Sequence, residues 1–515
     1  MAAAIMAVLL LPSIYFAWCF RDMSHLGALG DDGIYTVTAQ SLARGQGYRI
    51  ASLPGEPLQK KYPILYPLVL SAIWRMAPDF PANAKWIMLA SWVFLPVFLV
   101  LCRLIAREFG LAGWRAWLLC AIVAINPMVL LLSVAPMSEM LFSCLLLICL
   151  MAIARASREN GGVWWAAAAG LAAAAAYLTR TAGVAVLLSG PIFFLLRRQH
   201  RRAAAFLAGM APAVIAWTWW MQGSVSASAD YSRAFYVDYT SIIRANLTWA
   251  SAPHIVLTNL SYMFQALGGL LLAMPDELAL LRAVGVLGAL GFVLWWQRAG
   301  WTPYSVFVAI YCVILLVQPY TPNERFLVPV LPLLVGGLLA LPAPRGAIQL
   351  AAGGIAALCV FGIAGPGFLA GHLRAQEHLG QDVARACHWI HATLPEEARF
   401  ISAYDTIIYL RTGRQGTGYL FPTRMAYLGD TQGERRALAG LPAYASDRHL
   451  DYVLASSAAS VSILNPVENS MAMDVVRANF DEVYRAGSVE IFRRRSGGRA
   501  LAGAGLEPRS SLARN

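Results

Sequence analysis

Long apolar runs separated by short polar loops dominate the first 370 residues of the sequence. A helix needs about 20 apolar residues to cross a bilayer. Charged residues make up only 13% of the chain, about half the share that is typical of soluble domains. We therefore predict a polytopic α-helical membrane protein, with spans at 3–20, 84–104, 113–132, 137–155, 164–180, 183–197, 203–221, 279–296, 302–319, 324–341 and 347–370.

Two other apolar segments leave the number of spans open. Residues 63–77 are short for a span, and residues 255–273 carry Asn, Ser, Tyr and Gln side chains. Both could lie in the membrane interface as helices. The chain then has 11 spans if neither segment crosses and 13 if both do, and both counts keep the C-terminal region outside. If exactly one segment crosses, the orientation of everything after it is inverted. The N-terminal run lacks the basic start of a signal peptide, so we interpret it as the first, uncleaved span.

Arginines are concentrated in the short loops, as in "RRQHRR" at 197–202, and the formal net charge is +12. Positive charge in short loops marks the cytoplasmic side of a membrane protein, so this charge indicates orientation rather than nucleic-acid binding. The rule places the N-terminus in the cytoplasm. It also places the first loop (21–83) and the residues after 371 on the extracytoplasmic face. We expect an integral protein of a bacterial inner membrane.

The chain changes character near residue 372. Polar residues replace the apolar runs, a helical pattern comes first, and "DYVLAS" (451–456) and "GSVEIFRR" (487–494) are typical of strands. A helix is expected between them at 470–480. The predicted parts are a membrane domain (1–371), a small extracytoplasmic α/β domain (372–495) and a disordered tail (496–515).

The first loop contains the stretch "GDDGIYTVTAQSLARGQGYR" (30–49). One explanation of Asp31 and Asp32 is a helix cap, because a carboxylate can accept from the free backbone N–H groups at a helix start. A cap accounts for one of the two acids better than for both. A carboxylate at the membrane surface can also act as a general base toward an acceptor hydroxyl, or bind a metal ion.

Further charged residues stand at the predicted extracytoplasmic ends of the spans. Lys60 and Lys61, in "QKKYPILYP", could lie among lipid headgroups or clamp a lipid-linked phosphate. Glu139, in "SEMLF", could favour the helix dipole, or it could belong to a functional site, because a carboxylate at membrane depth is costly. Arg180, in "YLTRTAG", could be the structural partner of a carboxylate or contact phosphate.

Glu324 and Arg325 stand at the entrance of another span, in "QPYTPNERFLVPVLPLL". The prolines nearby indicate an irregular entry, which is tolerated where it lines a polar cavity. Arginine suits bidentate contact with phosphate. Each of these signals is weak by itself. Their shared position on one face predicts a site there, and that position depends on the topology above.

The sequence lacks a P-loop and the GxGxxG, HExxH and GxSxG motifs. Two functions stay open beside an enzyme. A flippase or transporter of lipid-linked sugars would need polar residues near mid-span, where this chain has almost no charge. A non-catalytic membrane protein could instead bind a polymer or a partner through its outer domain.

These stretches together resemble the GT-C class of membrane glycosyltransferases, which includes protein O-mannosyltransferases, the lipid A aminoarabinose transferase and rhizobial lipopolysaccharide glycosyltransferases. The stretch from Asp31 to Tyr48 is similar to their first-loop pattern of two acids, a Tyr and a short helix that ends in Gly. "KKYPILYP" is similar to the Glu-Lys-Pro-Pro-Leu-Tyr stretch of the aminoarabinose transferase. "SEMLF" and "NERFLVPVLPLL" resemble recurrent segments, and the similarity covers about residues 1–340.

The resemblance implies a GT-C fold and transfer of a sugar, with inversion, from a polyprenyl-phosphate donor to a hydroxyl of a glycan, lipid or protein acceptor. It places Asp31 at the catalytic acid position, Asp32 at the acid that follows it, and Lys61 at the donor phosphate. The further candidates are Lys60, Arg180 and Arg325 for phosphate binding, and Tyr35, Tyr62, Glu139 and Glu324 elsewhere in the site.

The same resemblance leaves a divalent metal ion open as a cofactor, with Asp31, Asp32 and Glu139 as the available ligands. The metal-linked Glu that precedes the Lys in the aminoarabinose transferase is Lys60 here, and Tyr62 replaces the first Pro. The sequence therefore selects neither that sugar nor metal dependence.

Overall fold

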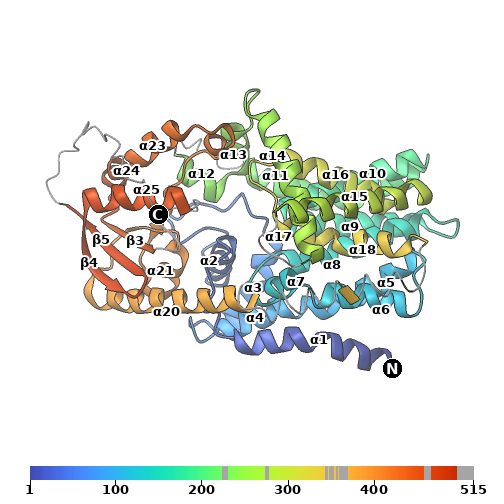
Figure 1. Cartoon of the computed structure of the whole chain (residues 1–515), viewed down its shortest axis with the longest axis horizontal. Coiled ribbons are helices and arrows are strands. Elements are labelled where there is room, and N and C mark those ends of the chain that lie inside the picture. The colour runs from blue at the N-terminus through green and yellow to red at the C-terminus, as the bar shows by residue number, and fades with distance from the viewer. Residues whose placement is uncertain are drawn as a thin grey trace, which may run out of the picture.

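The structure is a computed structural model that describes residues 1–222, 230–272, 278–342, 369–456 and 466–495, with isolated positions at 346, 353–354 and 358. A body of helices occupies one end of the molecule, and a region of helices and strands occupies the other (Figure 1). The chain is an integral membrane protein, because the helices of the body are apolar and expose large side chains such as Trp164, Leu171 and Trp219.

The helices of the body coincide broadly with the predicted spans. Ala and Leu, which are strong helix formers, recur along them, and a chain in lipid must satisfy its backbone hydrogen bonds internally. The helices are α1 (Ala2–Cys19), α4 (Ala84–Trp92), α5 (Phe94–Glu108), α6 (Trp114–Ala124), α7 (Pro127–Val134), α8 (Glu139–Ser157), α9 (Val163–Thr179), α10 (Val184–Leu196), α11 (His200–Gln222), α14 (Ala252–Leu272), α15 (Leu278–Ala299), α16 (Pro303–Val317), α17 (Glu324–Leu327) and α18 (Leu331–Ala340).

Within the described residues, six helices are long and apolar enough to cross a membrane, and the bent pair α6–α7 would make a seventh. Four shorter apolar helices accompany them. The expected number was 11 to 13, and it differs because several of the apolar runs form helices of only 10–17 residues. The predicted span 347–370 lies almost entirely outside the described residues, and the predicted tail 496–515 lies wholly outside them.

The two ambiguous segments differ in length. Residues 63–77 form α3 (Leu65–Met76), which has 12 residues and rises about 18 Å, less than the hydrocarbon core of a bilayer. The second segment forms α14, which has 21 residues and is long enough to cross. Span counting alone therefore does not orient the C-terminal region. The contacts of the C-terminal region with the first loop place these two parts on the same face of the molecule.

The bend between α6 and α7 has a local cause. The Asn126 side-chain oxygen accepts from the N–H groups of Met128 and Val129, at 3.1 and 3.3 Å, and Pro127 occupies the first turn of α7. The Asn126 amide donates to the Leu270 carbonyl at 2.7 Å, so the break is satisfied within the protein. The two helices differ in direction by 60°. This bend sets the path by which the chain enters α8.

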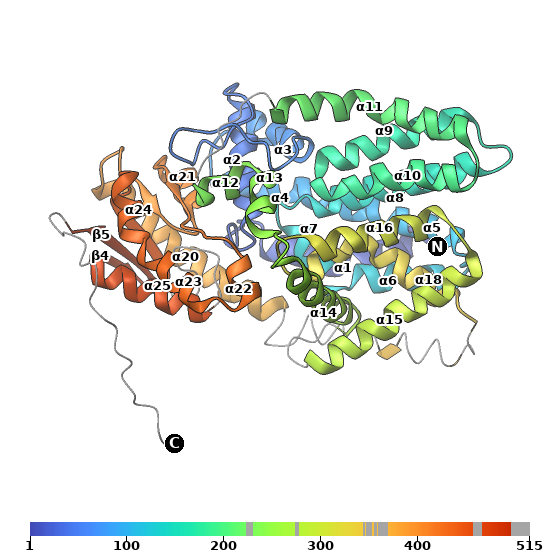
Figure 2. The ribbon, with the colours of Figure 1, turned by 90° about the horizontal axis from the view of Figure 1, so that it is seen from above.

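The short basic loops of the body lie together, at the end farthest from the C-terminal region (Figure 2). Arg158 forms an ion pair with Glu108 at 2.7 Å, and Arg202 donates to the carbonyls of Arg158 and Gly161. The N-terminus lies toward the same end of the body (Figure 2). The arrangement agrees with the charge-based prediction that these loops share one side of the membrane.

The C-terminal region begins with the long helix α20 (Leu369–Thr393) and contains a five-stranded sheet of order β2-β1-β3-β5-β4. β1 pairs in parallel with β2 and β3, whereas β5 is antiparallel to β3 and β4. The two predicted strands and the helix between them are present. The elements are β1 (Phe400–Ile401), α21 (Asp405–Thr412), β2 (Gly416–Thr417), α22 (Arg424–Leu428), α23 (Thr431–Ala439), α24 (Leu441–Asp447), β3 (Tyr452–Ser456), α25 (Pro466–Asn479), β4 (Phe480–Ala486) and β5 (Val489–Arg494).

The C-terminal region packs against the first loop and its helix α2 (Asp31–Ala43). The Gly416 N–H donates to the Ser52 carbonyl at 2.9 Å. Gly33 of α2 lies so close to Thr406 that a Cβ at this position would be 2.1 Å from the threonine hydroxyl oxygen. The first loop and the C-terminal region therefore share one face of the molecule. Two short helices complete this face, α12 (Tyr231–Val237) and α13 (Tyr239–Asn246).

Candidate active site

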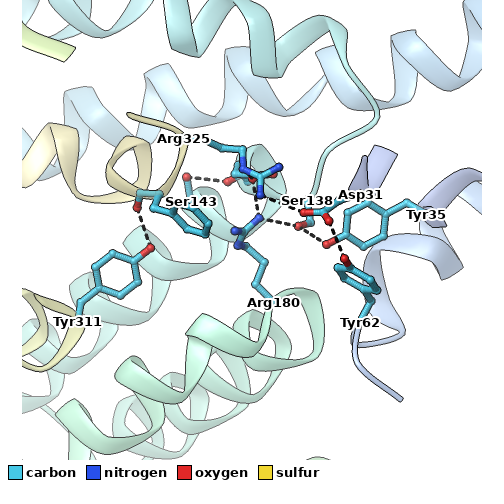
Figure 3. Close-up of polar contacts among 10 residues, drawn as sticks. Asp31, Tyr35, Tyr62, Ser138, Ser143, Arg180, Tyr311 and Arg325 are labelled. Atoms are coloured by element: carbon cyan, nitrogen blue, oxygen red, sulfur yellow. Dashed lines mark hydrogen bonds and ion pairs between the residues drawn. The ribbon is translucent and has the colours of Figure 1, made fainter. Parts of the chain in front are cut away.

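Asp31 is the first residue of α2 and belongs to a polar cluster between the first loop and the helical body (Figure 3). One oxygen of its carboxylate accepts a hydrogen bond from the Tyr62 hydroxyl at 2.5 Å. The other oxygen lies 3.0 Å from the Arg325 guanidinium of α17. Asp31, Tyr62 and Arg325 are far apart in the sequence, and the structure brings them together. Their stretches were predicted to lie on one face of the membrane.

Glu139, the first residue of α8, is the second carboxylate of the cluster. Its side chain is fully buried, and one oxygen lies 2.6 Å from Arg180 and 3.2 Å from Arg325. Both contacts are ion pairs, and within the described ranges neither oxygen accepts a well-aligned hydrogen bond. A buried carboxylate is costly unless it is paired, and the two guanidinium groups supply that pairing. Arg325 thus joins the two acids of the cluster.

Hydroxyl groups hold the cluster in place. Ser138 accepts from Arg180 at 3.2 Å and shares a hydrogen bond of 2.9 Å with Tyr35 (Figure 3). Tyr311, from α16, donates to the Phe326 carbonyl at 2.7 Å and so fixes the short helix α17. Tyr35 was a predicted site residue, whereas Ser138 and Tyr311 were not. Both of these lie in otherwise apolar segments, where a lone hydroxyl is a weak signal.

Lys61 lies beside the cluster in an aromatic cage. Its ammonium group donates to the Phe235 carbonyl at 2.7 Å and lies 3.9 Å from the centre of the Phe235 ring. The rings of Tyr62 and Tyr320 are 4.9 and 6.0 Å away. The negative faces of aromatic rings stabilise such a cation. Phe235, on α12, was not predicted, and Tyr320 was passed over although it lies in the "QPYTPNER" stretch.

Asp32 takes a different position from the one expected for a catalytic acid. Its side chain is buried, and its two oxygens accept from the backbone N–H groups of Gly27 and Gly33, at 2.8 and 2.9 Å. Burial raises the pKa of Asp32 to about 6. The carboxylate therefore stabilises the turn that leads into α2. This role is close to the capping explanation that suited one of the two acids.

Glu324 stands apart from the cluster, although Arg325 follows it directly. Its side chain lies against α14, where a Cβ at Gly269 would be 2.6 Å from a Glu324 oxygen. Successive residues of a helical turn point in different directions, so only one member of this pair reaches the site. Lys60 is half-buried, and its neighbour Lys61 is the cation that the aromatic cage holds.

The surrounding charges keep Asp31 ionised. Burial acts to raise the pKa of Asp31, but Arg325, Lys61 and the Tyr62 hydrogen bond outweigh it, and the pKa lies below its ordinary value. Burial lowers the pKa of Lys61 to about 8, against the opposing effect of Asp31. By formal charge the site holds two carboxylates, Asp31 and Glu139, and three cations, Lys61, Arg180 and Arg325, which leaves one positive charge in excess.

The three acids considered as metal ligands do not come together as a metal site. Asp31 contacts Tyr62 and a guanidinium, Asp32 accepts from backbone N–H groups, and Glu139 is paired with two arginines. Within the described parts of the chain, no group of three or more His, Cys, Asp or Glu side chains could hold a metal ion. The residues present do not fit a metal cofactor, because the oxygens of Asp31 and Asp32 already accept from protein donors and Glu139 faces two guanidinium groups, which would repel a cation.

Comparison with known proteins gives a match at the level of structure. The sequence matches no known family and no curated protein. The crystal structure of ArnT from Cupriavidus metallidurans bound to undecaprenyl phosphate matches 96% of this chain and 99% of its own, with 14% identity and a TM-score of 0.57. The oligosaccharyltransferase of Archaeoglobus fulgidus, in a complex with Zn and sulfate, matches 83% of this chain, with 13% identity and a TM-score of 0.52.

This chain spans 64% of the length of the oligosaccharyltransferase, so the second match covers only part of that protein. At these identities the likeness concerns the fold. Both solved structures are GT-C glycosyltransferases. The chain therefore has the GT-C fold, with the small strand-containing region at its C-terminal end, and the fold expected from the sequence is confirmed.

Proposed function

We propose that the chain transfers a sugar from a polyprenyl-phosphate donor to an acceptor hydroxyl, with Asp31 as the general base and inversion at the anomeric carbon. One observation carries this proposal. Of the four carboxylates predicted for the site, Glu324 stands apart from the cluster and Asp32 and Glu139 are fully buried, whereas the Asp31 side chain is 22% exposed and lies beside the cations. A general base must be within reach of the proton that it removes.

The excess positive charge suits the phosphate of the donor. A phosphodiester carries one negative charge, which balances the one positive charge in excess at the site. The Arg180 and Arg325 side chains are 10% and 15% exposed, so neither is fully enclosed, and Arg325 contacts Asp31. A guanidinium can contact two phosphate oxygens at once, whereas the Lys61 ammonium acts as a point charge.

The proposed reaction moves negative charge from the base to the leaving group. The acceptor oxygen bonds to the anomeric carbon while the bond from that carbon to the phosphate oxygen breaks, and Asp31 takes the hydroxyl proton. The carboxylate loses its charge as polyprenyl phosphate gains one. Arg325 touches Asp31, so it stands where it can turn from the neutralised base to the departing phosphate.

The fold and the charge distribution support the rest of the proposal. The ArnT structure contains undecaprenyl phosphate, which favours a polyprenyl-phosphate donor here. The Arg-rich loops lie at the end of the body away from the site, so the positive-inside rule favours a site on the extracytoplasmic face. The C-terminal region, on the same face as the site, would then be extracytoplasmic, with the bacterial inner membrane as the proposed location.

Turnover by the full-length protein in lipid nanodiscs tests this proposal. The assay supplies a panel of polyprenyl-phosphate sugars with glycan, lipid and peptide acceptors, and it measures release of polyprenyl phosphate and labelling of the acceptor. Loss of a general base lowers rates by about 10²–10⁴-fold, and we expect that loss for Asp31→Asn. Asp22→Asn, which changes an exposed acid of the same loop, should leave the rate unchanged.

Full transfer by the Asp31→Asn variant would disprove the assignment of the base. The rate should also resist EDTA, because the site residues do not fit a metal ion. A flippase is distinguished in vesicles, where it would move the lipid-linked sugar across the membrane without releasing polyprenyl phosphate. That result in the wild-type protein would contradict the proposed transfer.

A further inference from the structure

A pocket of about 220 Å³, lined by both charged and apolar residues, lies at the junction of the first loop, the start of α12 and the C-terminal region. None of the site residues described above lines it. Pro54 contributes from the first loop, and Asp230 and Arg233 from the start of α12. The C-terminal region contributes Tyr444, Asp447 and Arg448. The pocket therefore forms only where three separate parts of the chain meet.

Contacts within the pocket orient its polar groups. Arg448 and Asp230 form an ion pair at 3.1 Å, in which the Asp230 side chain is 10% exposed. The Arg448 guanidinium also lies over the Tyr444 ring, 4.7 Å from its centre. The ion pair and the Tyr444 ring together fix the Arg448 guanidinium, so the pocket presents an aromatic ring next to planar charged groups. Arg233 and Asp447 are exposed.

The charges of the pocket differ in balance from those of the active site. Two arginines and two aspartates line the pocket, so its formal charges cancel, whereas the active site has one positive charge in excess. Polar groups of both signs favour a ligand that both donates and accepts hydrogen bonds and carries no net charge. The prolines and the tyrosine add apolar surface. An uncharged saccharide fits these properties, because its hydroxyl groups both donate and accept hydrogen bonds and its C–H faces can pack against apolar surface.

The pocket and the active site are joined by α12. Asp230 and Arg233 stand at its start, while the carbonyl of Phe235 accepts from Lys61. At a rise of 1.5 Å per residue, residues 230 and 235 are about 7.5 Å apart along the axis of the helix. Tyr236 adds a second connection, because its hydroxyl accepts from the Gly418 N–H, next to Thr417 of the pocket lining.

We propose that this pocket binds an uncharged saccharide portion of the acceptor. The proposal rests on the proposed glycosyl transfer, and it specifies the class of acceptor. The position supports an acceptor rather than a donor, since the first loop and the C-terminal region form the pocket, and a lipid-linked donor would enter between the apolar helices. The volume lies below the roughly 300–1,000 Å³ of pockets for drug-sized ligands, which suits a short saccharide.

Direct binding without a donor tests this proposal. The probes are cellobiose, maltose, mannobiose and diacetylchitobiose, with glucose 6-phosphate as the charged comparison. Saturation-transfer NMR and calorimetry measure their binding to the full-length protein in nanodiscs. We expect at least one neutral disaccharide to bind, and to bind more tightly than glucose 6-phosphate. The variant Arg233→Ala/Asp447→Ala should weaken that binding at least tenfold.

Matched controls separate the pocket from the fold and from the catalytic step. Arg435→Ala/Asp474→Ala removes the same two kinds of charge from exposed positions outside the pocket, and it should bind like the wild type. The Asp31→Asn variant should also bind the disaccharide normally, because it lacks only the proposed base. If that variant binds sugar yet still transfers it, the proposed base is wrong and the pocket stands.

Three results would overturn the pocket assignment. The first is that no neutral disaccharide binds the wild type. The second is that the pocket variant, with an unchanged melting temperature, binds as well as the wild type. The third is that glucose 6-phosphate binds more tightly than every neutral probe, which would indicate a site for anions.

Discussion

The charged cluster has two halves that are held in different ways. The body half consists of Glu139, Arg180 and Arg325, whose side chains project from the helical body. Glu139 forms ion pairs with Arg180 at 2.6 Å and with Arg325 at 3.2 Å. The loop half consists of Asp31 and Lys61, which stand on the first loop. Asp31 is partly exposed, and the backbone of α12 accepts the hydrogen bond from Lys61.

This difference separates two tasks that a charged site must perform. A fully buried carboxylate with two guanidinium partners fixes the positive charges and contributes to folding. A partly exposed carboxylate at the start of a loop helix can meet a substrate with less cost to the fold. Substitutions in the body half should therefore act first on stability, and substitutions in the loop half should act first on catalysis.

The largest effect on stability is expected for Glu139→Gln. This change leaves the buried Arg180 guanidinium without its ion-pair partner and leaves Arg325 paired with Asp31 alone, and breaking a buried pair in this way costs about 3–5 kcal/mol. Thermal unfolding of the purified protein should show the loss. Glu324→Gln serves as the control, because Glu324 is half-buried but stands outside the cluster. Equal shifts in the two variants would contradict the division into halves.

A change in pH should affect the loop half before the body half. The pKa of Lys61 is lowered to about 8, so its positive charge is lost as the pH rises through that value. We expect kcat/KM for the donor to fall above pH 8, with unfolding temperatures little changed. Lys61→Arg keeps its charge and should remove this alkaline decline. A decline that persists in the variant would assign it to another group.

The smallest effect is expected at Asp405, which begins α21 and is buried. One oxygen accepts from the Tyr236 hydroxyl at 3.2 Å, and burial raises the pKa of Asp405 to about 7. The ordinary pKa of an aspartate is about 3.9. Between about pH 4 and 7 the folded chain retains a proton that the unfolded chain has lost, so stability falls as the pH rises through this range.

The variant Asp405→Asn cannot titrate and should lose that pH dependence. Its melting temperature should therefore improve relative to the wild type between pH 5 and pH 8. Asp474→Asn, at an exposed position of α25, provides the control. If the Asp405→Asn and wild-type curves run parallel over this range, Asp405 is not the titrating group.

The comparison also shows which parts of the site could be predicted from the sequence. Asp31, Lys61, Glu139, Arg180 and Arg325 are charges at the ends of apolar runs, where charge is unusual, and this local signal identified all five. The apolar runs likewise predicted most of the helices. Both kinds of signal lie within short stretches of sequence.

The remaining features depend on geometry that a short stretch does not encode. Whether Asp31 or Asp32 faces the site is decided by the turn before α2, and whether Glu324 or Arg325 does so is decided by the start of α17. The partner of Lys61 is a backbone carbonyl, which every residue has, so nothing in the sequence marks Phe235. The bend at Asn126, by contrast, had a visible signal in the Asn-Pro pair, and it divided a run that was predicted as one span.

The hydrogen bond from Lys61 to α12 also has a consequence for the order in which the protein is made. The two bonded residues are 174 positions apart, and Tyr236, the neighbour of Phe235, bonds to Asp405 a further 169 positions along the chain. A ribosome that has finished α18 has therefore delivered every charge of the site, but not the segment that anchors α12. Contacts between such distant residues form late and slowly. The half of the site that is synthesised first is thus completed last, when the C-terminal region reaches the first loop.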